Sequence, residues 1–205
     1  MNKTSQKESQ SNIKPQGNLK ISARKAKKPL ERITQGDIFQ NIEILEQIEI
    51  DKSLIRINKI SFPFVVCLNQ ECDLETDFNK HNGNLSHNNL LHLAVAPAFI
   101  FEQYLRGKHW GEIFNPINPQ KHKDTIIQKT KDNEVPRYHY LKFPDTDMPE
   151  LIIDFKHFFS INKNNLYNNI NNRLCSLDDL FKEKINQRFS YYISRIGLPE
   201  HNIHP

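Results

Sequence analysis

The sequence predicts a mainly β fold with added helices, in which a small barrel or strongly bent sheet is closed by a C-terminal helix. Five to seven short strand-like segments precede any long helix. Residues 63–68 form an apolar run that stops abruptly at polar residues, which is typical of a buried strand. Residues 176–196 carry apolar side chains at helical spacing. This order of elements argues against a parallel α/β fold.

The predicted strands follow one another from a turn at residues 34–37. The first begins at about Ile38, and a second extended piece is indicated by alternating isoleucines that lead into residues 54–57 and then 63–68. A short apolar run at 90–96 ends at Pro97. Residues 137–143 alternate with a strand period, and residues 151–155 give one more strand. The alternating isoleucines are Ile42, Ile44, Ile48 and Ile50.

Two helices are predicted, one inside the strand series and one after it. Residues 98–106 place apolar side chains on one face and end at Gly107. The segment from Lys108 to Pro136 is rich in proline and charge, so we expect it to run over the surface. The Asn-rich residues 162–172 predict a loop.

The C-terminal helix has the clearest signals for its beginning and end. Ser176 with Asp179 resembles a capping box, and Gly197 and Pro199 would end the helix. We expect its wide apolar stripe to lie against the sheet. The stripe consists of Leu177, Leu180, Phe181, Ile185, Phe189, Tyr192, Ile193 and Ile196.

Positive charge is concentrated in the first 33 of the 205 residues. That segment carries nine Lys or Arg against two acids, although the whole chain has a net charge of only +4. It offers almost nothing to bury, so we predict a disordered basic tail followed by a single domain over residues 34–205. Lys25, Lys27 and Lys28 are the candidates for loose phosphate contacts, and a solvated extension without a partner is the alternative.

Composition also sets limits on location and chemistry. No run of 18 apolar residues occurs and no secretion signal is present, so we expect no membrane contact and a cytoplasmic protein whose three cysteines are thiols. The chain lacks a phosphate-binding loop, a Gly-rich nucleotide fingerprint and a nucleophile elbow. Common nucleotide-cofactor enzymes are therefore excluded, and we expect no cofactor.

The order of these motifs resembles that of the MazF/PemK-type toxin family, whose members are small SH3-like barrels. The resemblance spans residues 35–197, with the insertion at 99–135, and implies an SH3-like barrel closed by the C-terminal helix. The matched motifs are Gly36-Asp37-Ile38, then Pro63 with Val65, Val66 and Leu68, then Val95-Ala96-Pro97, then residues 151–155 with Asp154, and finally Arg173-Leu174 with Leu177.

The family's two catalytic positions are not retained. Phe62 stands where the family usually has an arginine used in RNA cleavage, and Ala98 and Phe99 stand where it has a Thr or Ser. Ribonuclease activity therefore cannot be carried over on these residues, and fold alone does not imply function.

Polar residues at the end of the 63–68 strand are the first candidates for a site. Gln70, Cys72 and Asp73 would lie at the rim of the sheet, with Cys72 as a nucleophile if a His or Lys lowers its pKa. A polar turn is the alternative, and a metal site fits no standard zinc spacing. The histidines considered for Cys72 are His81, His87, His92 and His139.

A second candidate is the pair Arg137 and His139, which a strand would place on one face. An arginine and a histidine could contact a phosphate and move a proton, as RNA cleavage requires. We expect this pair to face the rim, with Asp37 nearby as a binding residue. The alternative is an edge strand with a solvated basic face. His109 and Trp110 could stack on a base, or Trp110 could be buried.

The leading hypothesis is a toxin-like or toxin-derived cytoplasmic barrel that engages RNA or a protein partner, with ribonuclease activity left open. The alternative is a non-enzymatic interaction module whose basic tail contacts nucleic acid. The partners considered are RNA or other nucleic acid, an antitoxin-like protein or a subunit of a larger complex, and a second copy of the chain.

Overall fold

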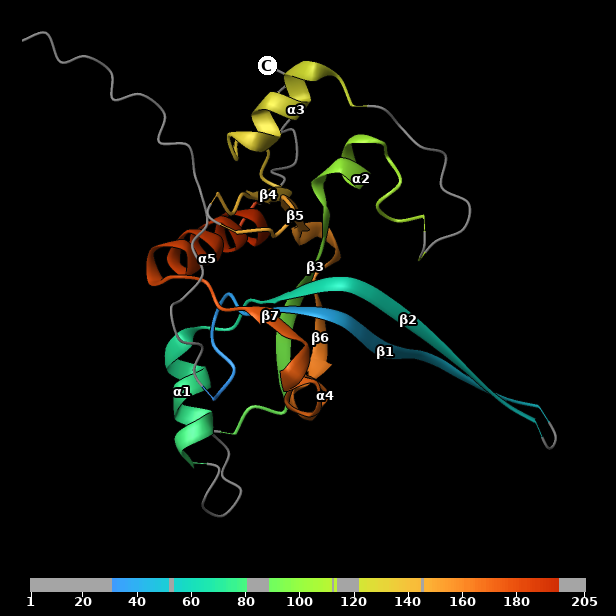
Figure 1. The fold of residues 1–205 in the computed structure, drawn as a ribbon. Helices are drawn as coiled ribbons and strands as arrows, with labels where there is room; N and C mark the ends of the chain where they lie inside the picture. The colour runs from blue at the N-terminus through green and yellow to red at the C-terminus, as the bar shows by residue number, and fades with distance from the viewer. Residues whose placement is uncertain are drawn as a thin grey trace, which may run out of the picture.

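The computed structural model describes residues 31–51, 54–80, 89–111, 113, 122–144 and 146–195. Within them, seven strands form one antiparallel sheet in the order β4-β5-β3-β2-β1-β7, and β6 pairs with β3 beside β5 (Figure 1). The strands are β1 (Ile38–Asp51), β2 (Leu54–Cys67), β3 (His92–Ile100), β4 (Tyr138–Leu141), β5 (Leu151–Asp154), β6 (Phe159–Asn162) and β7 (Arg173–Cys175). The helices are α1 (Glu71–Lys80), α2 (Phe101–Leu105), α3 (Asp124–Lys131), α4 (Lys163–Asn168) and α5 (Asp179–Ile193), with 3₁₀ helices η1 (Phe155–His157) and η2 (Ile170–Asn172).

The predicted mixture of an antiparallel sheet with helices is confirmed, but the sheet is open. Its path ends at β4 and β7, and these two strands do not pair with each other in the described part of the chain. Closure into a barrel is therefore not observed there, and the SH3-like type stays a prediction. None of the described helices is long and apolar enough to cross a membrane.

The centre of the sheet is buried on both faces. Val65 and Val66 are neighbours on β2 whose side chains point to opposite faces, and both are fully buried. One face contributes to a core that we call the α4 core, and the other to a core that we call the α5 core. The α4 core includes Phe39, Phe62, Val65, Phe99, Tyr104, Trp110, Tyr138 and Leu166. The α5 core includes Ile38, Val66, Ala98, Leu141, Ile153, Phe155, Phe181 and Ile185.

Helix α5 lies on the sheet as predicted, with somewhat shorter bounds. Phe181 and Ile185 are buried in the α5 core, and Phe189 and Tyr192 pack against it. The N-cap is Asp178, whose carboxylate accepts a hydrogen bond from the Asp179 amide at 2.7 Å, so the cap predicted at Ser176 is wrong by two positions. The predicted end signals at residues 197 and 199 lie outside the described residues.

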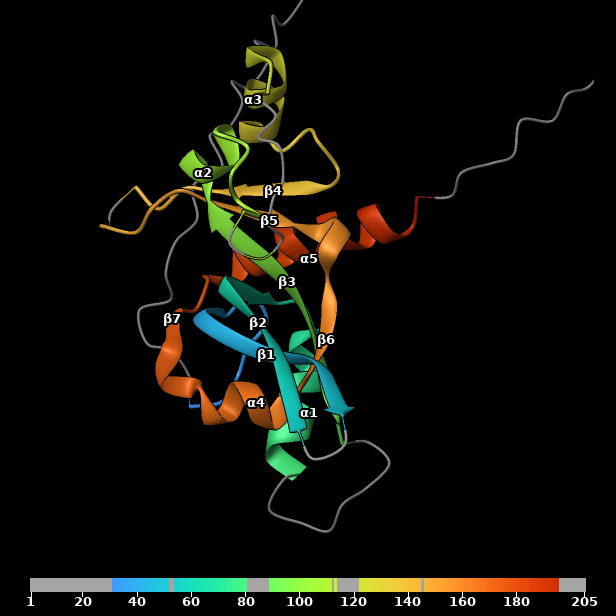
Figure 2. The same ribbon diagram turned by 90° about the vertical axis from the view of Figure 1, so that its right-hand side faces the viewer.

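The alternating segments predicted before residue 63 are strands, but each is part of a longer strand. The segment with the alternating isoleucines continues from Ile38 as β1, and residues 54–57 continue into the 63–68 run as β2. β1 and β2 contain 14 residues each and pair along their whole length. Their distal part projects from the body as a two-stranded ribbon (Figures 1 and 2). We call this ribbon, residues 42–51 with 54–63, the arm.

Two segments that were predicted to lack regular structure form helices. The polar segment after Leu68 winds into α1, because Glu71 and Asp73 in its first turn favour a helix N-terminus. The Asn-rich loop predicted at 162–172 contains α4, which Asn162 caps by accepting a hydrogen bond from the Asn164 amide at 2.9 Å. The fully buried Leu166 anchors that helix in the α4 core.

The predicted insertion is helical, with different bounds. β3 runs to Ile100, so the helix predicted at 98–106 begins at Phe101 and ends at Leu105. Part of the predicted surface excursion folds as α3, which buries Thr130.

The basic tail was predicted to reach residue 33, and this boundary is wrong at its end. Ile33 is fully buried in the α4 core, and Arg32 lies 2.7 Å from Glu71. Residues 1–30, with the predicted phosphate contacts Lys25, Lys27 and Lys28, lie outside the described residues.

Candidate active site

The end of β5 carries a fully buried carboxylate with three donors around it. Asp154 has 0% exposure and accepts a hydrogen bond from the Lys156 amide at 3.1 Å, which caps η1. Arg137 donates to both carboxylate oxygens, from Nε at 2.8 Å and from Nη2 at 2.6 Å. His157 Nδ1 lies 3.0 Å from Oδ2. The strand end and the short 3₁₀ turn therefore fix Asp154 between a guanidinium and an imidazole.

The charges of this ion pair reinforce each other. Burial alone would raise the pKa of Asp154, but hydrogen bonds and charge from Arg137, followed by His157, hold it below its ordinary value. Burial would likewise lower the pKa of Arg137, but Asp154 raises it overall. Asp154 and Arg137 are therefore both charged at neutral pH.

The partners of the buried carboxylate reach the surface. The side chain of Arg137 is 32% exposed and that of His157 is 36% exposed, whereas Asp154 is hidden beneath them. Arg137 has five N–H groups and uses two of them on Asp154. With Nδ1 directed to Asp154, His157 has Nε2 left for a proton transfer.

A continuous series of rings surrounds these groups. Trp110 lies 4.4 Å from His157 between ring centroids, and His109 lies 5.2 Å from Tyr104. His122 stacks on Tyr104 at 4.4 Å with an interplanar angle of 17°. We call the following residues the Asp154 cluster: Tyr104, His109, Trp110, His122, Arg137, Tyr138, Asp154 and His157.

Two histidines of the cluster are held neutral at pH 7. Burial lowers the pKa of His109 to about 4, and neither of its ring nitrogens has a hydrogen-bond partner among the described residues. Burial, followed by the positive charge of Arg137, lowers the pKa of His122 below its ordinary value. His122 is half-buried, so its neutral ring is available as a proton acceptor.

Arg137 therefore lies beside Asp154 and the histidines of the cluster. His139, which was expected next to Arg137, lies elsewhere. The prediction that both share a face is wrong, because Arg137 precedes β4 and turns toward Asp154. His139 pairs in register with Ile153, which belongs to the α5 core, and is 1% exposed. Burial, with the charges of Arg188 and Lys184, lowers the pKa of His139 to about 3.

The predicted rim at residues 70–73 is likewise not assembled with Arg137 and His139. Gln70 immediately precedes α1, and Cys72 and Asp73 are exposed in its first turn, where Cys72 Sγ lies 3.8 Å from both Gln70 Oε1 and Asp73 Oδ1. Figures 1 and 2 both place α1 at the opposite end of the molecule from β4.

Asp37 is fully buried in a network of its own. It accepts hydrogen bonds from the Thr34 amide at 2.8 Å and the Thr34 hydroxyl at 2.6 Å, and Arg173 Nη1 donates to it at 3.0 Å. Gly36, with φ of 75°, makes the turn that these contacts fasten. The geometry gives Asp37 a structural role, because its carboxylate is occupied and hidden from solvent.

The remaining predicted ligands do not form a metal centre in the described part of the chain, where no group of three or more His, Cys, Asp or Glu side chains is arranged to hold an ion. His92 is exposed on β3. His81 and His87 lie outside the described residues.

Sequence reasoning missed Asp154, His157 and His122 as site residues. The first two carried a usable signal, because an aspartate that ends a predicted strand is followed three residues later by a histidine. A short turn after a strand can fold such a histidine back onto the carboxylate. No sequence signal placed His122 near them, since it comes from the insertion.

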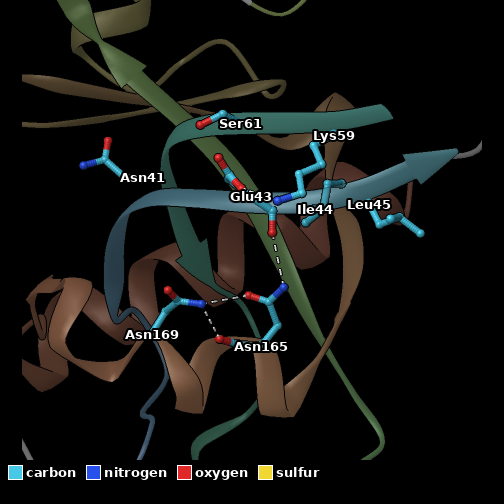
Figure 3. A pocket seen from close by; sticks show the side chains of 8 residues that line it. All are labelled: Asn41, Glu43, Ile44, Leu45, Lys59, Ser61, Asn165 and Asn169. Carbon is cyan, nitrogen blue, oxygen red and sulfur yellow. Dashed lines mark hydrogen bonds and ion pairs between the residues drawn. The ribbon is translucent and has the colours of Figure 1, made fainter. Parts of the chain in front are cut away.

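A separate hollow of about 540 Å³ lies at the root of the arm (Figure 3). It is lined by Asn41, Glu43, Leu45 and Lys59 of the hairpin and by Asn165 and Asn169 around α4. None of its lining residues belongs to the Asp154 cluster, where the titratable groups are gathered. We therefore place the candidate chemistry at the Asp154 cluster and treat the hollow as a possible docking surface.

Comparison with known proteins adds no family to this geometry: neither a protein-family model nor a curated protein sequence matches the chain.

Proposed function

We propose that this chain is a toxin-like protein that engages RNA and cleaves it at the Asp154 cluster. The observation that carries the proposal is the fully buried Asp154 carboxylate, which holds an arginine and a histidine that both reach solvent. Such an arrangement orients a cation and an acid–base group without exposing the anion that positions them.

Arg137 is assigned to the scissile phosphate. Its guanidinium is kept charged by Asp154 and stacked over the Tyr138 ring at 4.7 Å. The N–H groups that Asp154 does not occupy can donate to a phosphate oxygen, where negative charge develops during cleavage.

Two imidazoles are assigned to proton transfer. His122, neutral at pH 7, accepts the proton of the ribose 2′-hydroxyl as its oxygen attacks phosphorus. His157 Nε2 is assigned to give a proton to the 5′-oxygen as the P–O5′ bond breaks. The products are a 2′,3′-cyclic phosphate and a 5′-hydroxyl, and the exchange of one proton for another balances the step.

The positions that match the catalytic residues of the MazF/PemK-type family are buried here, which supports a site at a different place in this chain. Phe62 is buried and stacks on Phe159 at 4.7 Å, and Ala98 and Phe99 are fully buried. These side chains fill the two cores, so no polar chemistry is available there. Toxin-like cleavage in an SH3-like sheet would therefore use the groups at the end of β5 instead.

Charge outside the cluster agrees with a polyanionic substrate. Lys156, next to His157, is exposed, and Lys123 and Lys129 are exposed around the start and last turn of α3.

The test uses an oligonucleotide with one ribonucleotide in an otherwise 2′-deoxy strand. We expect cleavage directly after the ribonucleotide, with a cyclic phosphate identified by mass spectrometry, and no cleavage of the all-deoxy or 2′-O-methyl strand. The activity must co-elute with the protein. Equal cleavage of the all-deoxy strand, or no cleavage of any ribonucleotide linkage, would contradict the proposal.

A second function, binding of a protein partner without chemistry, is favoured by one observation. The arm exposes four large aliphatic side chains, and the Asp154 cluster does not use them: Leu45, Ile48, Ile55 and Ile57.

A further inference from the structure

The arm is a two-stranded ribbon whose outer edges are free. β7 pairs with β1 only at Ile38 and Phe39, and β3 pairs with β2 only from Phe64 onward. Beyond these points no other strand pairs with either edge within the described residues. At about 3.3 Å per residue, the free edge of β1 extends for about 30 Å.

The register places the exposed aliphatic side chains on one face of the arm. Ile48 pairs with Ile57, and Leu45 pairs with Lys59 two residues further along β2. A bulge between Leu45 and Gln47 brings Leu45 and Ile48 to the same face, although they are three residues apart. Leu45, Ile48, Ile55 and Ile57 are 55%, 52%, 64% and 55% exposed.

The arm lacks a further element to cover this stripe within the described residues. A two-stranded hairpin is marginally stable in water, and a third strand or a packed helix is normally needed. The apolar stripe is too narrow to supply a standard interface of about 800 Å² per partner by itself. A partner strand that pairs with the arm would supply the third strand, and its main-chain hydrogen bonds would add to the small apolar contact.

The hollow at the root of the arm marks the edge that is open to such a partner. The backbone oxygen of Glu43 points away from β2 and accepts a hydrogen bond from Asn165 Nδ2 at 3.2 Å (Figure 3). A side-chain amide there makes the contact that a neighbouring strand would make. The hollow therefore adjoins the outer edge of β1, which Asn165 occupies at Glu43 and which no strand occupies further along the arm in the described part of the chain.

Charge differs between the two strands of the arm. β1 carries the exposed Glu46 and Glu49, and also Glu43, which pairs with Lys59 of β2 at 3.1 Å. Symmetric pairing of β1 with β1 of a second copy would bring Glu46 and Glu49 of the two copies together. The same carboxylates repel the phosphates of a nucleic acid. A basic strand from a different protein meets neither obstacle.

We propose that the free edge of β1 binds an extended segment of another protein, in which Lys or Arg alternate with aliphatic residues, as an added strand. Its backbone pairs with β1 from the hollow outward. Its aliphatic side chains extend the stripe of Leu45 and Ile48, and its basic side chains, on the opposite face, meet Glu49. This interface is independent of the Asp154 cluster.

The probe is a short fluorescein-labelled peptide of alternating Lys and Val, followed by fluorescence anisotropy against the whole chain. We expect saturable binding that weakens with salt, and a loss of about tenfold or more in affinity for Glu46→Lys/Glu49→Lys. Arg56→Glu, a charge reversal on β2, is the matched control and should not weaken binding. Circular dichroism confirms that both variants are folded.

Two further peptides separate strand addition from simple charge attraction. A Glu–Val peptide should not bind, and a Lys–Val peptide N-methylated along one backbone edge should lose at least about tenfold in affinity. Hydrogen exchange should show new protection in β1 and not in β2 when the Lys–Val peptide is bound. The proposal is overturned if no Lys–Val binding is seen, if the methylated peptide binds equally well, or if the β1 reversal has no effect.

Discussion

Asp37 and Asp154 are both fully buried, and each is paired with an arginine, but they differ in what surrounds that arginine. The side chain of Arg173, which pairs with Asp37, is 9% exposed, and the second partner, Thr34, is buried as well. The side chains of Arg137 and His157, which pair with Asp154, are 32% and 36% exposed. The same carboxylate chemistry therefore closes a turn in one place and presents donors to solvent in the other.

This difference assigns different consequences to the loss of each carboxylate. Asp37 ties together the turn at Thr34, the start of β1 and β7. Asp154 positions the side chains of Arg137 and His157, both of which reach solvent. We therefore expect substitutions of Asp37 to lower the stability of the fold, and substitutions of the partners of Asp154 to lower activity.

The largest expected effect is that of Asp37→Ala on stability. Removing the carboxylate leaves the charge of Arg173 without its counter-ion and the Thr34 amide without an acceptor, which should cost about 3 kcal/mol or more of unfolding free energy. Urea denaturation measures this. The matched control is Asp73→Ala at an exposed site, where a change within about 1 kcal/mol is expected. Equal effects of the two substitutions would refute the structural role of Asp37.

The next effect concerns Arg137→Lys. A lysine keeps the charge but lacks the planar fork that donates to both oxygens of Asp154 and still leaves N–H groups for a phosphate, so RNA cleavage should fall by about tenfold or more. Arg106→Lys is the control, because Arg106 pairs with Glu102 at an exposed position. Retention of the full cleavage rate in Arg137→Lys would show that bidentate positioning is not required.

The smaller effect on stability is the pH dependence contributed by His139. Its pKa is about 3 in the folded chain and about 6.5 when unfolded, so the unfolded chain binds more protons between these values. Stability should therefore fall as the pH drops from 6.5 toward 4, whereas the contribution of Asp154 is lost only below its ordinary pKa of 3.8. His139→Leu should reduce the loss of unfolding free energy between pH 7 and pH 4.5 by about 2 kcal/mol, as measured by urea denaturation at both pH values. An unchanged slope would mean that His139 is not buried as described.

The elements that could be predicted from the sequence are those whose apolar residues form a continuous local pattern and are buried in the structure. The apolar run 63–68 and the stripe of α5 are continuous patterns of sufficient length, and both elements are found. α1 and α4 were missed because their sequences are polar and each buries few side chains, among them Leu74 and Leu166. Their helices depend on caps and on tertiary anchors rather than on a periodic stripe.

The site was less predictable than the fold because it depends on long-range pairing. Arg137 was proposed from its residue type, but its partner Asp154 lies on the neighbouring strand, and neither segment of sequence indicates the register that joins them. His139 was misassigned because alternation alone does not say which face of β4 is covered by α5. The arm was missed as a surface because a bulge changes which side chains share a face.

The most direct test of the distinction between the two aspartates is His157→Gln, assayed for RNA cleavage and thermal unfolding beside His92→Gln, the same change at an exposed histidine of β3. We predict that His157→Gln loses about hundredfold or more in cleavage rate, with a melting temperature within a few degrees of the unaltered chain. His92→Gln should change neither. Full cleavage by His157→Gln, or a loss of activity that only follows a loss of folding, would contradict the account of Asp154 as the centre of a site.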